Sequence, residues 1–112
     1  MDVVSLTTLA DEQLAAARAS SAGRSAHTIH GGQQRALRQT VLALAGGRSL
    51  GEHESPGEAT LQVLVGRVRL SAGEDWAEAA VGDSLAIPPV RHDLAAIEDS
   101  VVLLSVISTA HA

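Results

Sequence analysis

The stretch that decides the fold is LGEHESPGEATLQVLVGRVRL, residues Leu50–Leu70. Its second half alternates apolar and polar residues, with Leu61 and Val63 on one face of a strand and Gln62 on the other. Its first half places a histidine beside three glutamates and a Pro-Gly corner. The stretch therefore predicts a half-buried strand that follows a loop rich in groups able to bind a metal.

Short strand-like runs separated by turn residues continue outward from this stretch. Paired glycines, Gly-Asp and Pro-Pro mark the ends of these runs. The predicted strands cover residues 25–30, 36–45, 59–65, 68–70, 76–81, 84–87, 92–97 and 101–108. Eight short strands at roughly regular spacing are typical of a sandwich or a barrel. The sequence therefore predicts an all-β domain.

One helix is predicted, over residues 5–20. Thr7 or Thr8 can cap its start, and Asp11 and Glu12 suit its positive first turn. Its apolar stripe is weak, which favours a helix that docks on other elements. We expect it to cover one edge or one end of the sheet.

Two of the predicted strands are apolar on both faces. These are residues 41–45 and 101–107. Strands of this kind are usually covered on both sides, and in a small domain the second cover is often another subunit. The pattern therefore predicts a homodimer.

The composition excludes several classes of protein. The chain has 112 residues, which is enough for one domain with one core. It has no cysteine, so disulfides, zinc–thiolate sites and cysteine nucleophiles are excluded. A net charge of −5 without a basic cluster argues against nucleic acid and anionic membranes as partners. The apolar runs are too short to span a bilayer and the N-terminus lacks a basic region, so we expect a cytoplasmic protein.

The sequence matches two spaced motifs of a known family. His53 follows Gly47 by six positions, and Gly66 occupies the turn that closes the first motif. The second motif, a glycine, five residues and a proline, is matched by Gly82 and Pro88. In these features the chain resembles the small single-domain cupins.

The resemblance implies a fold and a division of the chain. The fold is a double-stranded β-helix barrel, also called a jelly roll, with one short N-terminal helix. The implied parts are a helical segment over residues 1–24, a cupin barrel over 25–108 and a tail over 109–112. The Pro-Pro turn before His92 would carry that histidine into the barrel.

The departures from the family pattern concern its metal ligands, which are three histidines and one glutamate. The second histidine position falls on Ser55, and the glutamate position falls on Ala59. His92 stands one residue early in the second motif. The resemblance therefore implies a degenerate metal motif in which His53 and His92 are the remaining ligands.

Glu58 is the carboxylate that would complete a reduced metal site. With His53 and His92 it would form a two-histidine, one-carboxylate set, which suits one divalent ion such as Fe, Mn, Ni or Zn. On a regular strand, Glu58 points to the face opposite Ala59. The alternative is a pocket without metal, lined by His53, Ser55 and His92, whose histidines hydrogen-bond a polar ligand.

Trp76 is the only aromatic residue, so a site that stacks bases or several sugar rings is not expected. We expect Trp76 to be a packing anchor or a partly exposed strand residue. Arg67 and Arg69 alternate with apolar residues and are expected on a solvated sheet face. His27 and His30 are predicted to lie on opposite faces of one strand, as edge or interface residues.

The residues leave three functions open. The first is a binding module that holds a small polar or amphipathic molecule in an apolar barrel. The second is a metal-dependent dioxygenase or isomerase that acts on a small organic acid or a sugar derivative. The third is a structural or interaction protein, because fold alone does not decide function.

Overall fold

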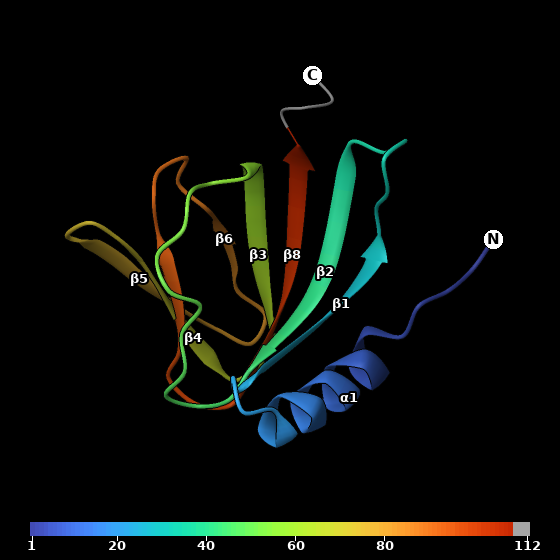
Figure 1. Cartoon of the computed structure of the whole chain (residues 1–112), viewed down its shortest axis with the longest axis horizontal. Coiled ribbons are helices and arrows are strands. Elements are labelled where there is room, and N and C mark those ends of the chain that lie inside the picture. The colour runs from blue at the N-terminus through green and yellow to red at the C-terminus, as the bar shows by residue number, and fades with distance from the viewer. Residues whose placement is uncertain (109–112) are drawn as a thin grey trace.

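A computed structural model describes residues 1–108; His111 and the rest of the predicted tail lie outside them. The order of elements is one helix followed by eight strands (Figure 1). The elements are α1 (Leu6–Ala19), β1 (Arg24–His30), β2 (Leu37–Leu44), β3 (Gly57–Val65), β4 (Arg67–Ala72), β5 (Asp75–Ala80), β6 (Ser84–Ala86), β7 (Asp93–Ala96) and β8 (Ser100–Ser108). Every predicted strand and the predicted helix are present, so the all-β prediction is confirmed.

The strands form two antiparallel sheets. The larger sheet has the order β1-β2-β8-β3-β6 and the smaller has the order β5-β4-β7. Strand β3 pairs with β8 in the larger sheet, and their continuations β4 and β7 pair in the smaller one. A two-stranded ribbon thus passes from one sheet to the other, which is the arrangement of a double-stranded β-helix.

The ribbon changes sheet at Gly66. This residue has φ of +80°, and a Cβ atom there would overlap the carbonyl oxygen of Asp99 and the hydroxyl of Ser100. Ser100 is buried, and its Oγ accepts from the Arg67 N–H at 3.0 Å and donates to the Glu98 carbonyl oxygen at 2.7 Å. The turn from β3 to β4 and the turn from β7 to β8 are therefore in contact at this point, and only glycine leaves room for that contact.

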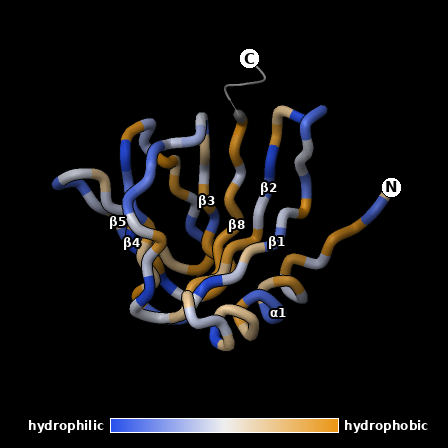
Figure 2. Tube along the Cα trace, viewed as in Figure 1, coloured by the Kyte–Doolittle hydropathy of each residue, from blue (hydrophilic) through white to orange (hydrophobic). Residues whose placement is uncertain are grey.

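The main core fills the space between the two sheets. Leu61 and Val63 of β3 point into it, as the alternation in the sequence predicts. Figure 2 shows hydrophobic residues along β3 and β8, the strands at the centre of the larger sheet. The other buried members of this core are Leu42, Leu44, Val68, Leu70, Ala79, Leu94, Ala96 and Val102.

Helix α1 covers the outer face of the larger sheet (Figure 1). Ala10, Leu14 and Ala17 pack on Val41 and Val101, among other outward-facing residues of β2 and β8. The prediction that the helix covers an edge or end is therefore wrong; it covers a face. The two doubly apolar strands are indeed buried on both sides, but their second cover is this helix rather than another subunit.

The start of α1 also differs from the prediction. Ser5 caps the helix, and its side chain accepts from the Thr8 N–H at 3.2 Å. A cap at Thr7 or Thr8 would have placed Asp11 and Glu12 in the first turn. The helix instead begins at Leu6, so its first turn contains no acidic residue. Within residues 1–108, no helix is both long and apolar enough to cross a membrane.

Asp99 ties the end of α1 to the barrel. Its carboxylate accepts from the Gly46 N–H at 2.8 Å and from Arg18 Nε at 2.7 Å. The Gly46 hydrogen bond, followed by the Arg18 hydrogen bond, holds the pKa of Asp99 below its ordinary value. The helix, the turn after β2 and the turn before β8 are thus held by one carboxylate.

The crossing at Gly66 gives a first prediction. Gly66→Ala should lower the free energy of unfolding by roughly 3 kcal/mol or more, because a strained φ is added to an overlap with backbone. The matched control is Gly73→Ala, where φ is +63° but nothing lies within 4 Å of the added Cβ. This control should lose only about 1–2 kcal/mol. Equal losses in urea unfolding would contradict the role given to Gly66.

Asp99 gives a second prediction. Because its pKa is lower in the folded state, its contribution is present above the unfolded pKa and is lost as the pH falls through the folded pKa. Asp99→Asn should therefore be less stable than the unsubstituted protein near neutral pH and lose less stability between about pH 5 and pH 2. Urea unfolding across this range measures both, with Asp11→Asn on the exposed helix surface as the control. Parallel pH curves for Asp99→Asn and the unsubstituted protein would contradict the prediction.

Candidate functional site

His53 and His92 are brought together by the backbone. The loop before β3 runs antiparallel to β7, and the Leu50 N–H donates to the Leu94 carbonyl oxygen at 3.0 Å. Further along, His53 and His92 exchange both of their backbone hydrogen bonds, at 2.9 and 3.0 Å. Residues paired in this way stand directly opposite each other, with their side chains on the same face.

The pairing of these histidines depends on a one-residue slip in the loop. Continuing the register of Leu50 opposite Leu94 without interruption would place Glu52, and not His53, opposite His92. The extra residue is accommodated around Gly51, whose φ of +86° is open to glycine at little cost. The slip therefore selects a histidine instead of a glutamate for the site.

The two imidazole rings form one group with a defined tautomer. Their centroids lie 4.5 Å apart in an edge-to-face arrangement. Nδ1 of His53 is 2.9 Å from the Gly51 carbonyl oxygen, and Nδ1 of His92 is 2.8 Å from that of Val90. A carbonyl oxygen only accepts, so each Nδ1 carries the proton and, in the neutral rings, each Nε2 keeps a lone pair.

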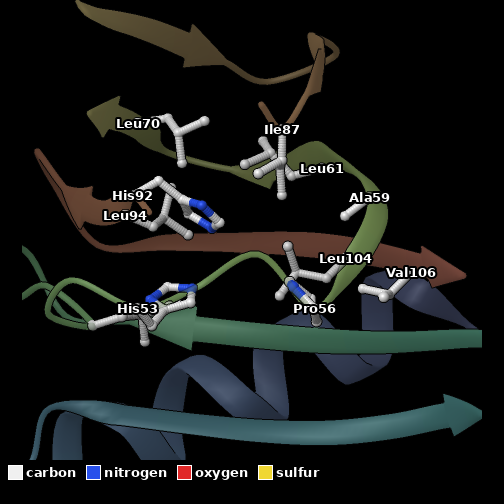
Figure 3. A pocket seen from close by; sticks show the side chains of 11 residues that line it. His53, Pro56, Ala59, Leu61, Leu70, Ile87, His92, Leu94, Leu104 and Val106 are labelled. Atoms are coloured by element: carbon white, nitrogen blue, oxygen red, sulfur yellow. The ribbon is translucent and has the colours of Figure 1, made fainter. Parts of the chain in front are cut away.

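These rings line one end of an apolar cavity (Figure 3). The cavity has a volume of about 60 Å³. His92 is 3% exposed and His53 is half-buried, so His53 is the more accessible of the two rings. Apart from the two histidines, every lining residue is apolar: Leu50, Pro56, Ala59, Leu61, Leu70, Ile87, Leu94, Leu104 and Val106.

Ser55 and Glu58, the other predicted site residues, lie outside this cavity. The Ser55 hydroxyl donates to the Gly57 carbonyl oxygen at 2.9 Å and borders a neighbouring groove. Strand β3 is already regular at Glu58, which pairs with Ile107 while Ala59 pairs with Val106. Ala59 faces the cavity, so Glu58 is exposed on the opposite face and is not brought to the histidines.

The residues present do not fit the metal centre that the cupin fold implies. Catalytic centres of this type use at least three protein ligands with an open position for substrate. Across residues 1–108, no group of three or more His, Asp or Glu side chains is placed to hold a metal ion. The cavity provides two imidazole nitrogens and no carboxylate. Two imidazoles alone do not complete such a centre.

Pro88 and Pro89 shape the other side of the site. The last hydrogen bond between this segment and β3 runs from the Ile87 N–H to the Ala59 carbonyl oxygen, at 2.9 Å. The prolines that follow have no N–H to donate, so the chain leaves β3 here and passes on to His92. The sequence motif correctly marked this turn, but the wall residues Leu50 and Pro56 were not predicted.

Three residues of the smaller sheet that were predicted to lie outside the site have exposed side chains. Arg67 and Arg69 are exposed and bind Glu78 at 3.2 and 2.7 Å, and the Arg69 hydrogen bond is the main cause of the lowered pKa of Glu78. Arg69 lies 4.3 Å from the ring centroid of Trp76, which is 60% exposed. Trp76 is thus a partly exposed strand residue, one of the two predicted roles.

The prediction that His27 and His30 lie on opposite faces is wrong, whereas their expected place at a sheet edge is confirmed, because β1 is an edge strand. The register with β2 slips between Thr28 and His30, so that His27 pairs with Val41 and His30 with Gln39. Val41 and Gln39 are two residues apart and face the same side of β2. His27 and His30 therefore lie on one face because a β-bulge breaks the simple alternation.

The tautomers of the site give a third prediction. At about pH 8, where a free imidazole is neutral, both rings should carry the proton on Nδ1. Two-dimensional ¹H–¹⁵N spectra of the histidine side chains should show a pyrrole-like Nδ1 and a pyridine-like Nε2 for His53 and His92. The exposed His27 is the internal reference and should show the mixture of tautomers typical of a free ring. A protonated Nε2 in either site ring would contradict the geometry.

Comparisons with known proteins agree with this fold. No protein-family model matches the sequence, and a search of curated proteins finds no match. A conserved protein of unknown function from Streptococcus pyogenes is 27% identical, with a TM-score of 0.70 and coverage of 80% of this chain and 77% of that one. A cupin 2 conserved barrel domain protein from Salinispora arenicola is 19% identical, with a TM-score of 0.70 and coverage of 98% and 91%.

An enzyme is among the similar structures. Salicylate 1,2-dioxygenase from Pseudoaminobacter salicylatoxidans is 19% identical, with a TM-score of 0.75 over 92% of this chain but only 32% of its own. At these identities the likeness establishes the fold and leaves the activity open. Together with the crossed ribbon and the two spaced motifs, it shows that this chain has the cupin fold, with a degenerate metal motif.

Proposed function

We propose that the protein binds a small amphipathic molecule in the barrel and holds the donor group of that molecule between His53 and His92. The observation that carries the proposal is the tautomer of the two rings. Both Nδ1 protons are used by backbone carbonyls, so the neutral rings offer only acceptors to the cavity. A hydroxyl or another donor that enters an otherwise apolar cavity has these two nitrogens as its partners.

The size of the cavity limits the buried part of the ligand. A water-sized group needs about 10–15 Å³ of such volume, so 60 Å³ accommodates roughly four to six groups of this size. Leucine, isoleucine and valine side chains around the histidines favour an unbranched apolar body. The ligand is therefore a short alcohol-like molecule, or a larger molecule that inserts a short hydroxyl-bearing arm.

A metal-dependent enzyme is the second candidate. It is supported by the common orientation of the two imidazoles, since a histidine that donates Nδ1–H to a carbonyl typically uses Nε2 as a metal ligand. As a dioxygenase or isomerase it would act on a small organic acid or a sugar derivative. It requires a carboxylate or a third imidazole near the pair, and the cavity lining contains neither. Binding without a metal is therefore the better-supported function.

A homodimer and a cytoplasmic location remain predictions. Helix α1 does not cover the whole outer face of the larger sheet. On the uncovered part, Leu37 is 38% exposed and Ile107 is 47% exposed. These two residues are direct cross-strand neighbours, so they form a small apolar area suited to a second copy. Sedimentation velocity would test the dimer, and Leu37→Ser should shift it toward monomer.

The binding proposal gives a fourth prediction. Short linear alkanols of about four to five carbons should cause saturable NMR shifts in the cavity residues, whereas ethers of equal length should bind about fivefold or more weakly because they cannot donate. Ala59→Leu, which fills the cavity from β3, should abolish these shifts. Ala77→Leu on exposed β5 is the matched control. Equal binding of ethers and alkanols, or binding that survives Ala59→Leu in a folded protein, would contradict the proposal.

A further inference from the structure

A second hollow adjoins the histidine cavity. It is an open groove of about 590 Å³ between the start of β3 and the segment that follows β6. The groove exists because the two prolines after Ile87 end the pairing with β3, and the chain diverges from Gly57 and Glu58. It is large compared with the cavity and is open to solvent along one side.

The groove and the cavity share two wall residues. Ala59 and Ile87 border both hollows, and the Ile87 N–H is bonded to the Ala59 carbonyl oxygen. The methyl group of Ala59 points into the cavity, and the groove begins just beyond the Ile87–Ala59 bond, where the two segments diverge. Figure 3 shows Ala59 at the end of the cavity away from the histidines. A chain that starts at the histidines and fills the cavity therefore ends beside the groove.

The groove contains one charged group. Glu58 borders it, is exposed, and makes no ion pair with any residue of the range 1–108. The neighbouring hydroxyl of Ser55 is already engaged with the Gly57 carbonyl oxygen. In the described part of the chain, neither hollow is lined by an arginine or a lysine. The groove is therefore suited to a cationic donor and unsuited to an anion.

We propose that the ligand is a short amino alcohol, or a molecule that carries such a unit. This rests on the proposed function and adds the identity of the second polar end. The hydroxyl donates to the His53 and His92 pair, the methylene chain passes Ala59 and Ile87, and the ammonium group lies in the groove beside Glu58. Both ends of the site present acceptors, so a molecule with a donor at each end complements it, and a hydroxy acid does not.

The test compares three series with the same hydroxyl and chain length. Aminoalkanols, alkanols and hydroxyalkanoates of about four to six carbons are titrated into the protein by NMR at low salt. Aminoalkanols should bind about two- to fivefold more tightly than the matching alkanols, the range for one exposed ion pair, and this advantage should shrink with added salt. Hydroxyalkanoates should bind most weakly.

Two variants assign the effect to the groove. Glu58→Gln should remove the advantage of aminoalkanols and leave alkanol binding unchanged, because it alters only the group beside the ammonium. Glu12→Gln, an equal change of charge on the exposed surface of α1, is the matched control and should leave the advantage intact. Ala86→Leu narrows the groove without altering charge, and should weaken aminoalkanols more than alkanols.

The outcomes separate this inference from the proposed function. Alkanols and aminoalkanols that bind equally, or an advantage that persists in Glu58→Gln, would overturn the amino alcohol while leaving a binding cavity. Preference for hydroxyalkanoates would overturn it as well. If no series binds, the proposed function itself fails, and the inference fails with it.

Discussion

The fold depends on the point where two strand connections cross. Gly66 follows the last residue of β3 and Ser100 begins β8, and here the ribbon moves from the larger sheet to the smaller one. The absence of a side chain at Gly66 allows the backbone of Asp99 and the hydroxyl of Ser100 to approach, and Ser100 then bonds Arg67. Because both strands of the ribbon change sheet together, the sheets are held face to face and the space between them closes into a barrel.

The site is a consequence of this closure. β7 lies in the smaller sheet because it pairs with β4, and the loop before β3 extends that sheet by pairing with β7. A slip of one residue at Gly51 then sets His53 opposite His92. Each ring is fixed by a carbonyl two residues earlier, so its free nitrogen is an acceptor. The barrel supplies apolar walls, and the chemistry that we propose for this arrangement is the binding of a donor group.

Most of the fold could be predicted from the sequence, and the reasons are local. Alternation in β3 and turn residues between strands fix the strands, since both act over a few residues. The position of α1 could not be predicted, because a weak apolar stripe on a helix does not specify which sheet face it meets. The start at Ser5 was missed because Thr7 and Thr8 also have capping side chains.

The site was predictable only in its motif positions. His53 and His92 follow from spacing, and the alternation rule places Glu58 away from Ala59, as observed. The slip at Gly51 and the bulge in β1 were not predictable, because each inserts one residue into a ladder and so reverses the expected faces. The groove beside Glu58 also required the structure, since it arises where Ile87 makes the last bond to β3.

The most direct test of the central claim is the metal content of the protein. Gently purified protein is incubated with Fe²⁺, Mn²⁺, Ni²⁺ or Zn²⁺, passed through a desalting column and analysed by mass spectrometry of the elements. Because two imidazoles without a carboxylate hold such ions weakly, we predict far less than one metal per chain and the same trace amount in His53→Ala. One retained metal per chain that is lost in both His53→Ala and His92→Ala would contradict the account.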